Sequence, residues 1–171
     1  MPSPQNVGEF LDGMQWVVDV IDIYAMPAKL ALHREARRRS IPVVAGACFG
    51  FGASMVVFAA DGLSYDACSG MSEGQDPKRN IECFIRFIAP EVPAYMRPHL
   101  EQAVAGRTHV PFVVPGPEVA GAFISTEICK HVLGMGHRVV APTGLFIDPV
   151  RGQIVEFEAS HAARRFAAAA G

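Results

Sequence analysis

The sequence has no closely spaced cysteine pair, no strong excess of charge and no long apolar run. Zinc knuckles and redox motifs place paired cysteines roughly two to four residues apart, whereas the cysteines here are widely scattered: Cys48, Cys68, Cys83 and Cys129. No zinc site is therefore expected, and free thiols fit a reducing cytoplasm. The formal net charge is −2, which gives no general attraction to nucleic acid.

The apolar runs are too short to cross a bilayer, which takes about 18 to 20 residues. Asp19, Asp22 and Pro27 interrupt the first candidate, and Asp61 ends the second. The start of the chain lacks the basic region and apolar core of a secretory signal. We therefore expect a soluble, cytoplasmic protein without a membrane partner.

The first third of the chain predicts a parallel strand–helix–strand unit. Residues Gln15–Ile21 form a short apolar run rich in β-branched side chains, typical of a strand buried on both faces. Residues Met26–Ser40 predict an amphipathic helix with Pro27 in its first turn. In this helix we assign alanines and Leu32 to the buried face and Lys29, His33, Arg34 and Arg37 to the polar face. Ile41–Ala45 is expected to be the second strand.

The next segments predict a change of direction and then a less regular region. Gly46–Gly52 is expected to be a glycine-rich bend and Ala53–Ala60 a third strand. Residues 64–117 contain many prolines and predict a loop-rich excursion, in which only Pro77–Ile88 shows a helical period.

The last third predicts a long helix followed by a strand meander. Glu118–Leu133 has a helical period and ends before Gly134. Short strands are expected at Val139–Val140, Leu145–Ile147 and Gln153–Phe157. The alanine-rich residues 159–171 are expected to fray. The chain is thus predicted to be a single α/β domain over residues 1–171, a partial Rossmann-like open sheet with a βαβ crossover, a mixed or antiparallel meander and a long late helix.

Several of these segments together resemble the ThiF/MoeB-type adenylyltransferases, which include ubiquitin-activating-like enzymes. The resemblance lies in the order of these sequence motifs: Val17-Val-Asp-Val-Ile-Asp22, the helix Lys29–Ala36, Ser40-Ile-Pro-Val-Val44, the glycines before Met55-Val-Val-Phe58, the late helix Phe123-Ile-Ser-Thr-Glu-Ile-Cys-Lys-His-Val-Leu-Gly134 and Phe146-Ile-Asp-Pro149. It covers roughly Phe10 to Phe157 and matches the carboxyl-terminal half of the family's fold.

The resemblance implies an enzyme that uses ATP and magnesium to attach AMP to a carboxylate of a small ubiquitin-like carrier protein or a peptide. Asp22 matches the family's magnesium-proximal aspartate, although Ile23 stands where the family has asparagine. Ligands of open α/β sheets bind beyond the carboxyl ends of the strands, which is where Asp22 is expected. Capping of the helix that begins near Ala25 explains Asp22 equally well.

Two family features are missing. The Gly-x-Gly-Gly-x-Gly turn that receives the nucleotide phosphates does not occur, since too few residues precede Val17, and the glycines of Gly46–Gly52 lie between two strands. The zinc-binding Cys-x-x-Cys pairs of many relatives are absent as well. The resemblance therefore predicts no ATP chemistry by this segment alone.

Other candidate residues have weaker support. Cys68 is expected in a loop and is a possible acceptor thiol for a thioester or persulfide. Cys48 and Cys129 are interpreted as packing residues, and Glu127 and Lys130 as a surface ion pair. No role is assigned to the histidines of the later segments.

Three interpretations stay open. The chain contributes Asp22 to a shared active site whose ATP loop comes from a partner polypeptide; or it is a non-catalytic ThiF-like docking module; or Met1 is an internal start of a longer protein. Because half of a doubly wound sheet is missing here, the strand at Gln15–Ile21 is expected to be an unpaired sheet edge. We therefore predict a homodimer or association with a subunit that bears the ATP loop.

Overall fold

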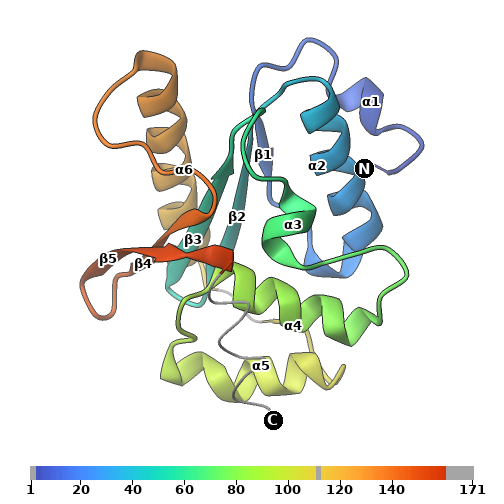
Figure 1. Cartoon of the computed structure of the whole chain (residues 1–171). Coiled ribbons are helices and arrows are strands. Elements are labelled where there is room, and N and C mark those ends of the chain that lie inside the picture. Colours follow the sequence, from blue (N-terminus) through green and yellow to red (C-terminus); the bar gives the residue numbers. More distant parts are fainter. Residues whose placement is uncertain (1–2, 111–112, 161–171) are drawn as a thin grey trace.

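The protein is an open five-stranded sheet with helices on both faces (Figure 1). The computed structural model describes residues 3–110 and 113–160. The strands lie in the order β1-β2-β3-β4-β5, and only β1 and β2 are parallel. Their bounds are β1 Val17–Asp19, β2 Val43–Phe49, β3 Gly52–Phe58, β4 Thr143–Asp148 and β5 Gln153–Glu158. The predicted mixed α/β sheet is confirmed.

The predicted parallel strand–helix–strand unit consists of β1, α2 and β2. The helix α2 spans Met26–Arg38 and follows the short 3-10 helix η1, Ile23–Ala25. β1 pairs with β2 from Val17↔Val43 to Asp19↔Ala45 and is shorter than expected. The Asp19 carboxylate explains its early end, because Oδ1 accepts the N–H of Ile21 at 2.9 Å and turns the backbone away from β2.

A tight hairpin joins β2 and β3, and the predicted glycine-rich bend is only partly correct. Gly46 to Phe49 continue β2, and only Gly50 and Phe51 form the turn. Gly50 has a positive φ of 58°, which glycine adopts without strain. Gly46 and Ala47 pair regularly with Met55 and Ser54 of β3, so the glycine content placed the start of the bend too early in the prediction.

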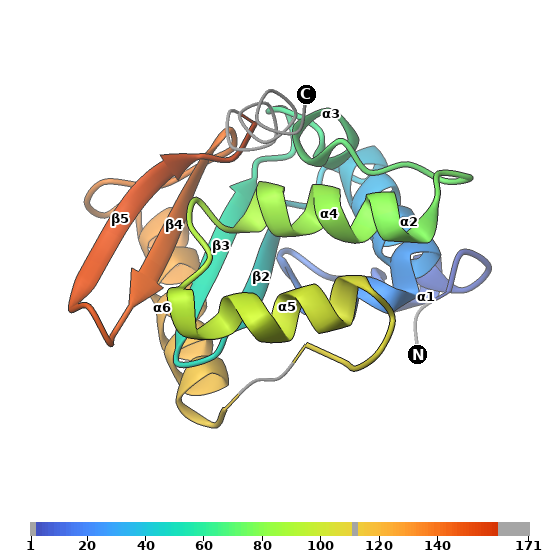
Figure 2. The ribbon, with the colours of Figure 1, turned by 90° about the horizontal axis from the view of Figure 1, so that it is seen from below.

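The predicted loop-rich excursion contains more helix than expected. It holds α3, α4, η2 and α5, which span Tyr65–Ser69, Pro77–Ile88, Ala94–Met96 and Arg97–Val104. The bounds of α4 agree with the prediction. In Figure 2, α4 and α5 lie side by side across one face of the sheet, and α6 lies on the other face. Proline explains the underestimate, since it occupies the first turns of α4 and α5, where it is compatible with a helix.

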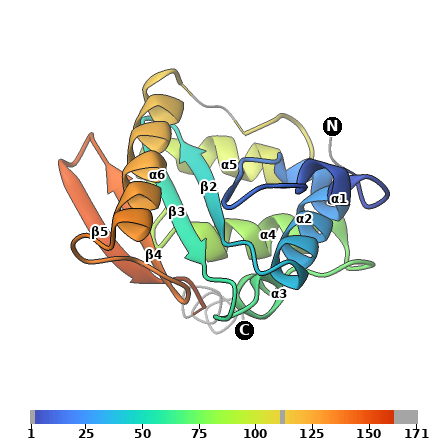
Figure 3. The ribbon, with the colours of Figure 1, turned by 90° about the horizontal axis from the view of Figure 1, so that it is seen from above.

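The late helix α6 spans Pro115–Leu133 and packs on β2 and β3 (Figure 3). It begins earlier than predicted because Pro115 and Pro117 lie in its first turn. The expected strand at Val139–Val140 does not form, whereas β4 and β5 confirm the other two strands of the meander. The expectation of a frayed tail concerns residues 159–171, of which 161–171 lie outside the described residues.

Each face of the sheet has its own apolar core. On one face, Leu30, Val56, Phe87 and Ile88 are buried between the sheet, α2 and α4. On the other face, α6 contributes Ile124 to a cluster with side chains of β2 and β3. A short N-terminal helix, α1 (Val7–Phe10), completes a third cluster with α2. None of the helices in the described residues is long and apolar enough to span a membrane.

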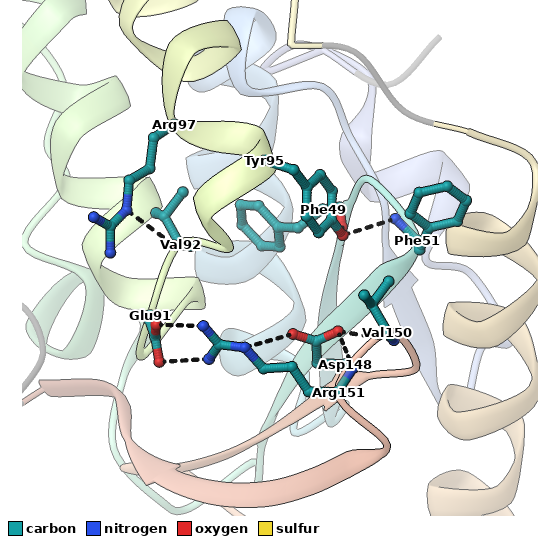
Figure 4. Close-up of polar contacts among 9 residues, drawn as sticks. All are labelled: Phe49, Phe51, Glu91, Val92, Tyr95, Arg97, Asp148, Val150 and Arg151. Atoms are coloured by element: carbon teal, nitrogen blue, oxygen red, sulfur yellow. Dashed lines mark hydrogen bonds and ion pairs between the residues drawn. The ribbon is translucent and has the colours of Figure 1, made fainter.

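Polar contacts hold the excursion against the sheet (Figure 4). Arg151, in the turn between β4 and β5, donates two hydrogen bonds to Glu91, at 2.9 and 3.0 Å. Asp148 accepts the N–H of Val150 and Arg151 and so fixes that turn. The hydroxyl of Tyr95 lies 3.4 Å from the carbonyl oxygen of Phe49 in β2. The segment that precedes α5 is therefore anchored to two neighbouring turns at one end of the sheet, β2–β3 and β4–β5.

Candidate functional site

Asp22 lies just beyond the carboxyl end of β1 and is exposed to solvent. Its Oδ1 accepts the N–H of Tyr24 at 3.0 Å, which makes Asp22 the N-cap of η1. Asp22 is thus a cap, but of η1 rather than of the helix α2, whose N-cap Ala25 makes no side-chain hydrogen bond. A cap uses one carboxylate oxygen, so it is compatible with a further ligand, and the magnesium role stays a prediction.

A pocket of about 420 Å³ opens beside Asp22. Its walls come from the segment that follows β1, from the second half of β2 and from helices of the excursion. They include Phe49 of β2, Phe84 and Ile85 of α4 and Leu100 of α5. Beyond Asp19 the chain leaves β2, and Gly46 to Phe49 then border the pocket. The end of β1 therefore presents a carboxylate at the mouth of an apolar pocket.

Behind the loop between β1 and α2 lies a fully buried cluster of three ionisable side chains. The sequence did not predict it. Asp19 Oδ2 accepts a hydrogen bond from Lys29 Nζ at 2.6 Å and lies 2.8 Å from His33 Nε2. The three residues are at most 5 % exposed. The assignment of Lys29 and His33 to the polar face of α2 is wrong, because both face β1 and pair with its carboxylate.

The cluster fixes the peptide that leads into Asp22. Asp19 Oδ1 accepts the N–H of Ile21, and Lys29 Nζ donates to the carbonyl oxygen of Ile21 at 3.0 Å. Both backbone polar groups of Ile21 are therefore held by side chains rather than by a neighbouring strand. Asp19 and Lys29 thus position the loop that carries Asp22.

The protonation states in the cluster follow from burial and pairing. Burial raises the pKa of Asp19, but the hydrogen bond with His33 and the charge of Lys29 outweigh it and leave the pKa below its usual value. The pKa of His33 is lowered, because burial and the charge of Lys29 together outweigh the hydrogen bond and charge of Asp19, which raise it. His33 is therefore neutral at pH 7 and donates Nε2–H to Asp19. Its ring also stacks on Tyr65, with 3.7 Å between the ring centroids.

Cys68 lies in α3 and is 2 % exposed, so the prediction of a loop position is wrong. Burial raises the pKa of its thiol to about 11. A thiol acts as a nucleophile in its thiolate form, and these surroundings disfavour that form. The acceptor role of Cys68 stays a prediction. Cys129 is exposed on α6, contrary to the packing interpretation, and Cys48 is half-buried and borders the pocket.

Glu127 and Lys130 pair at 2.6 Å, but not on the surface. Glu127 is buried, and its second oxygen accepts the N–H of Val139 at 2.8 Å. Within the described residues, no group of three or more His, Cys, Asp or Glu side chains converges as in a protein-only metal site. Among these residues, Asp22 is a lone carboxylate, and a cation there would need further ligands.

The family was decided by comparison with known proteins. A model of the ThiF family matches residues 2–166. The chain belongs to the ThiF family. The sequence motifs that suggested this resemblance lie in β1, α2, β2, β3, α6 and β4. The matched residues also include β5, so the ThiF match extends over the whole sheet.

Solved structures share the ThiF fold of this chain. One of them is the crystal structure of SeMet PaaA, which aligns with a TM-score of 0.60 at 11 % sequence identity. At this identity the likeness concerns the fold alone. The alignment covers 93 % of this chain but 46 % of that one, so the ThiF chain described here spans about half the length of that relative. No curated protein matches the sequence significantly.

Proposed function

We propose that this ThiF chain is the carboxyl-terminal part of an ATP-dependent adenylyltransferase that activates a carboxylate of a small carrier protein or a peptide. The glycine-rich loop that binds the ATP phosphates would come from a partner subunit or from an N-terminal half. The main support is the position of Asp22, an exposed carboxylate at the carboxyl end of a parallel strand and at the mouth of a pocket. Open α/β sheets bind their ligands at this place.

Asp22 suits Mg²⁺ that arrives with a nucleotide. Mg²⁺ is usually held by one or two carboxylates together with substrate phosphates and water. Asp22 supplies one such carboxylate, and no other acidic residue borders the pocket in the described part of the chain. In the proposed role, this magnesium would neutralise charge on the phosphates as pyrophosphate leaves.

The chain supplies no phosphate cradle at this place. The loop between β1 and α2, Val20–Ala25, contains no glycine, and Asp22 rather than free backbone N–H groups faces the pocket mouth. Backbone N–H groups at a glycine turn are what holds phosphates in such folds. The donor set thus fits magnesium better than the triphosphate, which is why the proposal includes a second source of phosphate contacts.

β1 offers a place for that second source. It is the edge strand of the sheet, and its outer backbone groups have no strand partner among the described residues. A parallel strand from an ATP-loop-bearing segment could extend the sheet there and bring its loop next to Asp22.

The first test is isothermal titration of the purified chain with ATP and Mg²⁺, comparing the natural protein with Asp22→Asn. Asparagine still accepts the N–H of Tyr24 and preserves the cap, but it removes the negative charge. Since the chain alone lacks a phosphate cradle, we expect weak binding that depends on Mg²⁺ and that the substitution lowers at least tenfold, at an unchanged melting temperature. Asp76→Asn is the matched control, because Asp76 is an exposed N-cap on α4, outside the pocket.

A failure would have a definite meaning. If neither the chain nor its complex with an ATP-loop-bearing partner binds ATP with Mg²⁺, the adenylyltransferase proposal falls. The alternative, a docking module that keeps the ThiF fold without ATP chemistry, would then account for the chain. Equal affinity of the natural protein and Asp22→Asn would remove Asp22 from the proposed site.

A further inference from the structure

The pocket beside Asp22 is apolar inside and acidic only at its mouth. Phe49, Phe84, Ile85 and Leu100 contribute to its walls, and Asp22 is the one acidic residue among the described residues that line it. Lys29 is a buried cation next to this wall. It pairs with Asp19, and its Nζ lies 5.4 Å from the ring centroid of Phe84. The described lining therefore favours an apolar group and contains no Lys or Arg that could pair with a buried negative charge.

We propose that the carboxylate activated at this site is the terminus of a peptide chain whose last residues have bulky apolar side chains. These side chains fill the pocket, and the terminal carboxylate stays at the mouth beside Asp22. This inference rests on the proposed function, since it assigns the substrate class for the same site.

Volume and polarity argue for this occupant. A space of about 420 Å³ is within the range of small-ligand pockets and exceeds what a glycine-ended chain could fill. A glycine-ended chain would leave the apolar walls in contact with water, so binding would not gain the free energy of burying them. A chain that ends in leucine or a similar residue covers them and leaves its charged end in solvent.

Two polar side chains in the lining favour a peptide over a simple fatty acid. Tyr24 and His109 both border the pocket and contact each other edge to face, with ring centroids 5.1 Å apart. Both are exposed. Their hydroxyl and imidazole groups can bond to backbone amides at the mouth, whereas a hydrocarbon chain has no groups for them. Because Asp22 is exposed as well, the rest of the peptide can leave the pocket towards solvent.

The test measures binding of two fluorescein-labelled hexapeptides that differ only at the end, Leu-Leu in one and Gly-Gly in the other. Both carry a terminal amide, which avoids repulsion by Asp22 and makes the measurement independent of ATP and Mg²⁺. Fluorescence anisotropy with the full chain should show at least tenfold tighter binding of the leucine-ended peptide. Ile81→Trp, which adds bulk to a half-buried lining position, should reduce that affinity at least fivefold.

A second measurement uses the natural protein and does not depend on a folded variant. Cys48 borders the pocket, and Cys129 is exposed on α6 outside it. Saturating leucine-ended peptide should slow the alkylation of Cys48 by iodoacetamide at least threefold, read by mass spectrometry, and leave Cys129 unchanged. Equal protection of both cysteines, or of neither, would contradict the proposed location.

The outcomes separate this inference from the proposed function. If the chain binds ATP with Mg²⁺ but prefers neither peptide, or prefers the glycine-ended one, the apolar substrate class is wrong and the enzyme proposal stands. If a free medium-chain carboxylic acid competes with the peptide at equal affinity, the peptide backbone has no part in recognition, and the inference also falls. If the leucine-ended peptide binds but neither the chain nor its complex with an ATP-loop-bearing partner binds ATP, the pocket assignment stands and the enzyme proposal falls.

Discussion

Asp19, Lys29 and His33 show how a buried ionic cluster can serve the loop in front of it. Removing charges from water is costly, and the cost is offset only when each charge has close partners. Here one carboxylate accepts from an ammonium group, an imidazole and the amide of Ile21. Because Ile21 immediately precedes Asp22, the cluster ties the orientation of an exposed carboxylate to the buried interior.

The buried His33 predicts a loss of stability in mild acid. Its pKa in the folded protein is lowered below the ordinary 6.5, so the unfolded chain binds a proton first as the pH falls. The stabilising contribution is complete above about pH 6.5 and is lost as the pH falls below that value. We expect the free energy of unfolding to drop by up to about 1.4 kcal/mol per pH unit in this window, measured by urea denaturation between pH 7.5 and 5.

His33→Gln provides the control, since glutamine can donate to Asp19 but does not titrate in this range. The variant should be less stable at pH 7.5 yet show a flatter profile down to pH 5. Asp19 does not enter this window, because its pKa is lowered from 3.8 and its contribution is lost only in stronger acid. Parallel profiles of the two proteins would refute the assignment to His33.

The sequence contained a signal for this cluster that amphipathic patterning concealed. Lys29 and His33 are one helical turn apart and so share a face with each other, and Asp19 stands inside an apolar strand. A carboxylate in a buried strand requires partners, and the only question was which ones. Patterning alone assigned Lys29 and His33 to solvent because it assumes that charged side chains lie outside, whereas the partner of a buried charge must itself be buried.

Glu127 gives α6 a role beyond covering the sheet. Its carboxylate accepts the N–H of Val139 at 2.8 Å and pairs with Lys130 at 2.6 Å. The segment between α6 and β4 has no strand of its own, so this bond fixes its path. The charge pattern predicted the pair with Lys130, but the bond to Val139 depends on a chain reversal that sequence spacing does not reveal.

Substitutions at Glu127 should separate these two interactions. Glu127→Ala removes both and leaves the Val139 N–H unpaired, which should lower the free energy of unfolding by about 2 to 3 kcal/mol. Glu127→Gln keeps an acceptor for Val139 and should cost only about 1 kcal/mol. Urea denaturation gives both values, and hydrogen exchange of the Val139 amide should rise only in the alanine variant. Equal losses for the two variants would mean that the ion pair alone matters.

Elements with a strong local signal were predicted well, and elements that depend on distant contacts were not. α4 has the predicted bounds because Asp76 and Pro77 mark its start and its apolar period is clear. β1 is shorter than predicted because the Asp19 side chain competes for the Ile21 amide. β2 is longer than predicted because its pairing with β3 continues through Gly46. The candidate site followed the same rule: the place of Asp22 beyond a strand was predicted, and the pocket was not, since distant helices form its walls.

Within residues 3–110 and 113–160, no helix or strand covers the side of the sheet edge at β1. β1 is the edge of the sheet, and apolar side chains around it are exposed, with Met14 at 51 %, Val18 at 42 % and Val20 at 70 %. The last turn of α6 adds Val132 and Leu133, which are also exposed. The opposite edge, β5, also exposes Ile154 and Val155, but it carries the charged Glu156 and Glu158, which discourage strand pairing. The asymmetry favours association through the β1 side.

We therefore predict that the isolated chain self-associates at micromolar concentration through the edge at β1. Multi-angle light scattering should give a mass above the 18.4 kDa of one chain. Val18→Lys places a charge on the edge strand and should weaken association at least tenfold, because lysine on an edge opposes strand addition. Val150→Lys is the matched control: Val150 is 60 % exposed but lies in the turn between β4 and β5. A monomer at all concentrations would refute self-association and leave the β1 edge to a different subunit, whereas equal effects of the two lysine variants would move the contact away from β1.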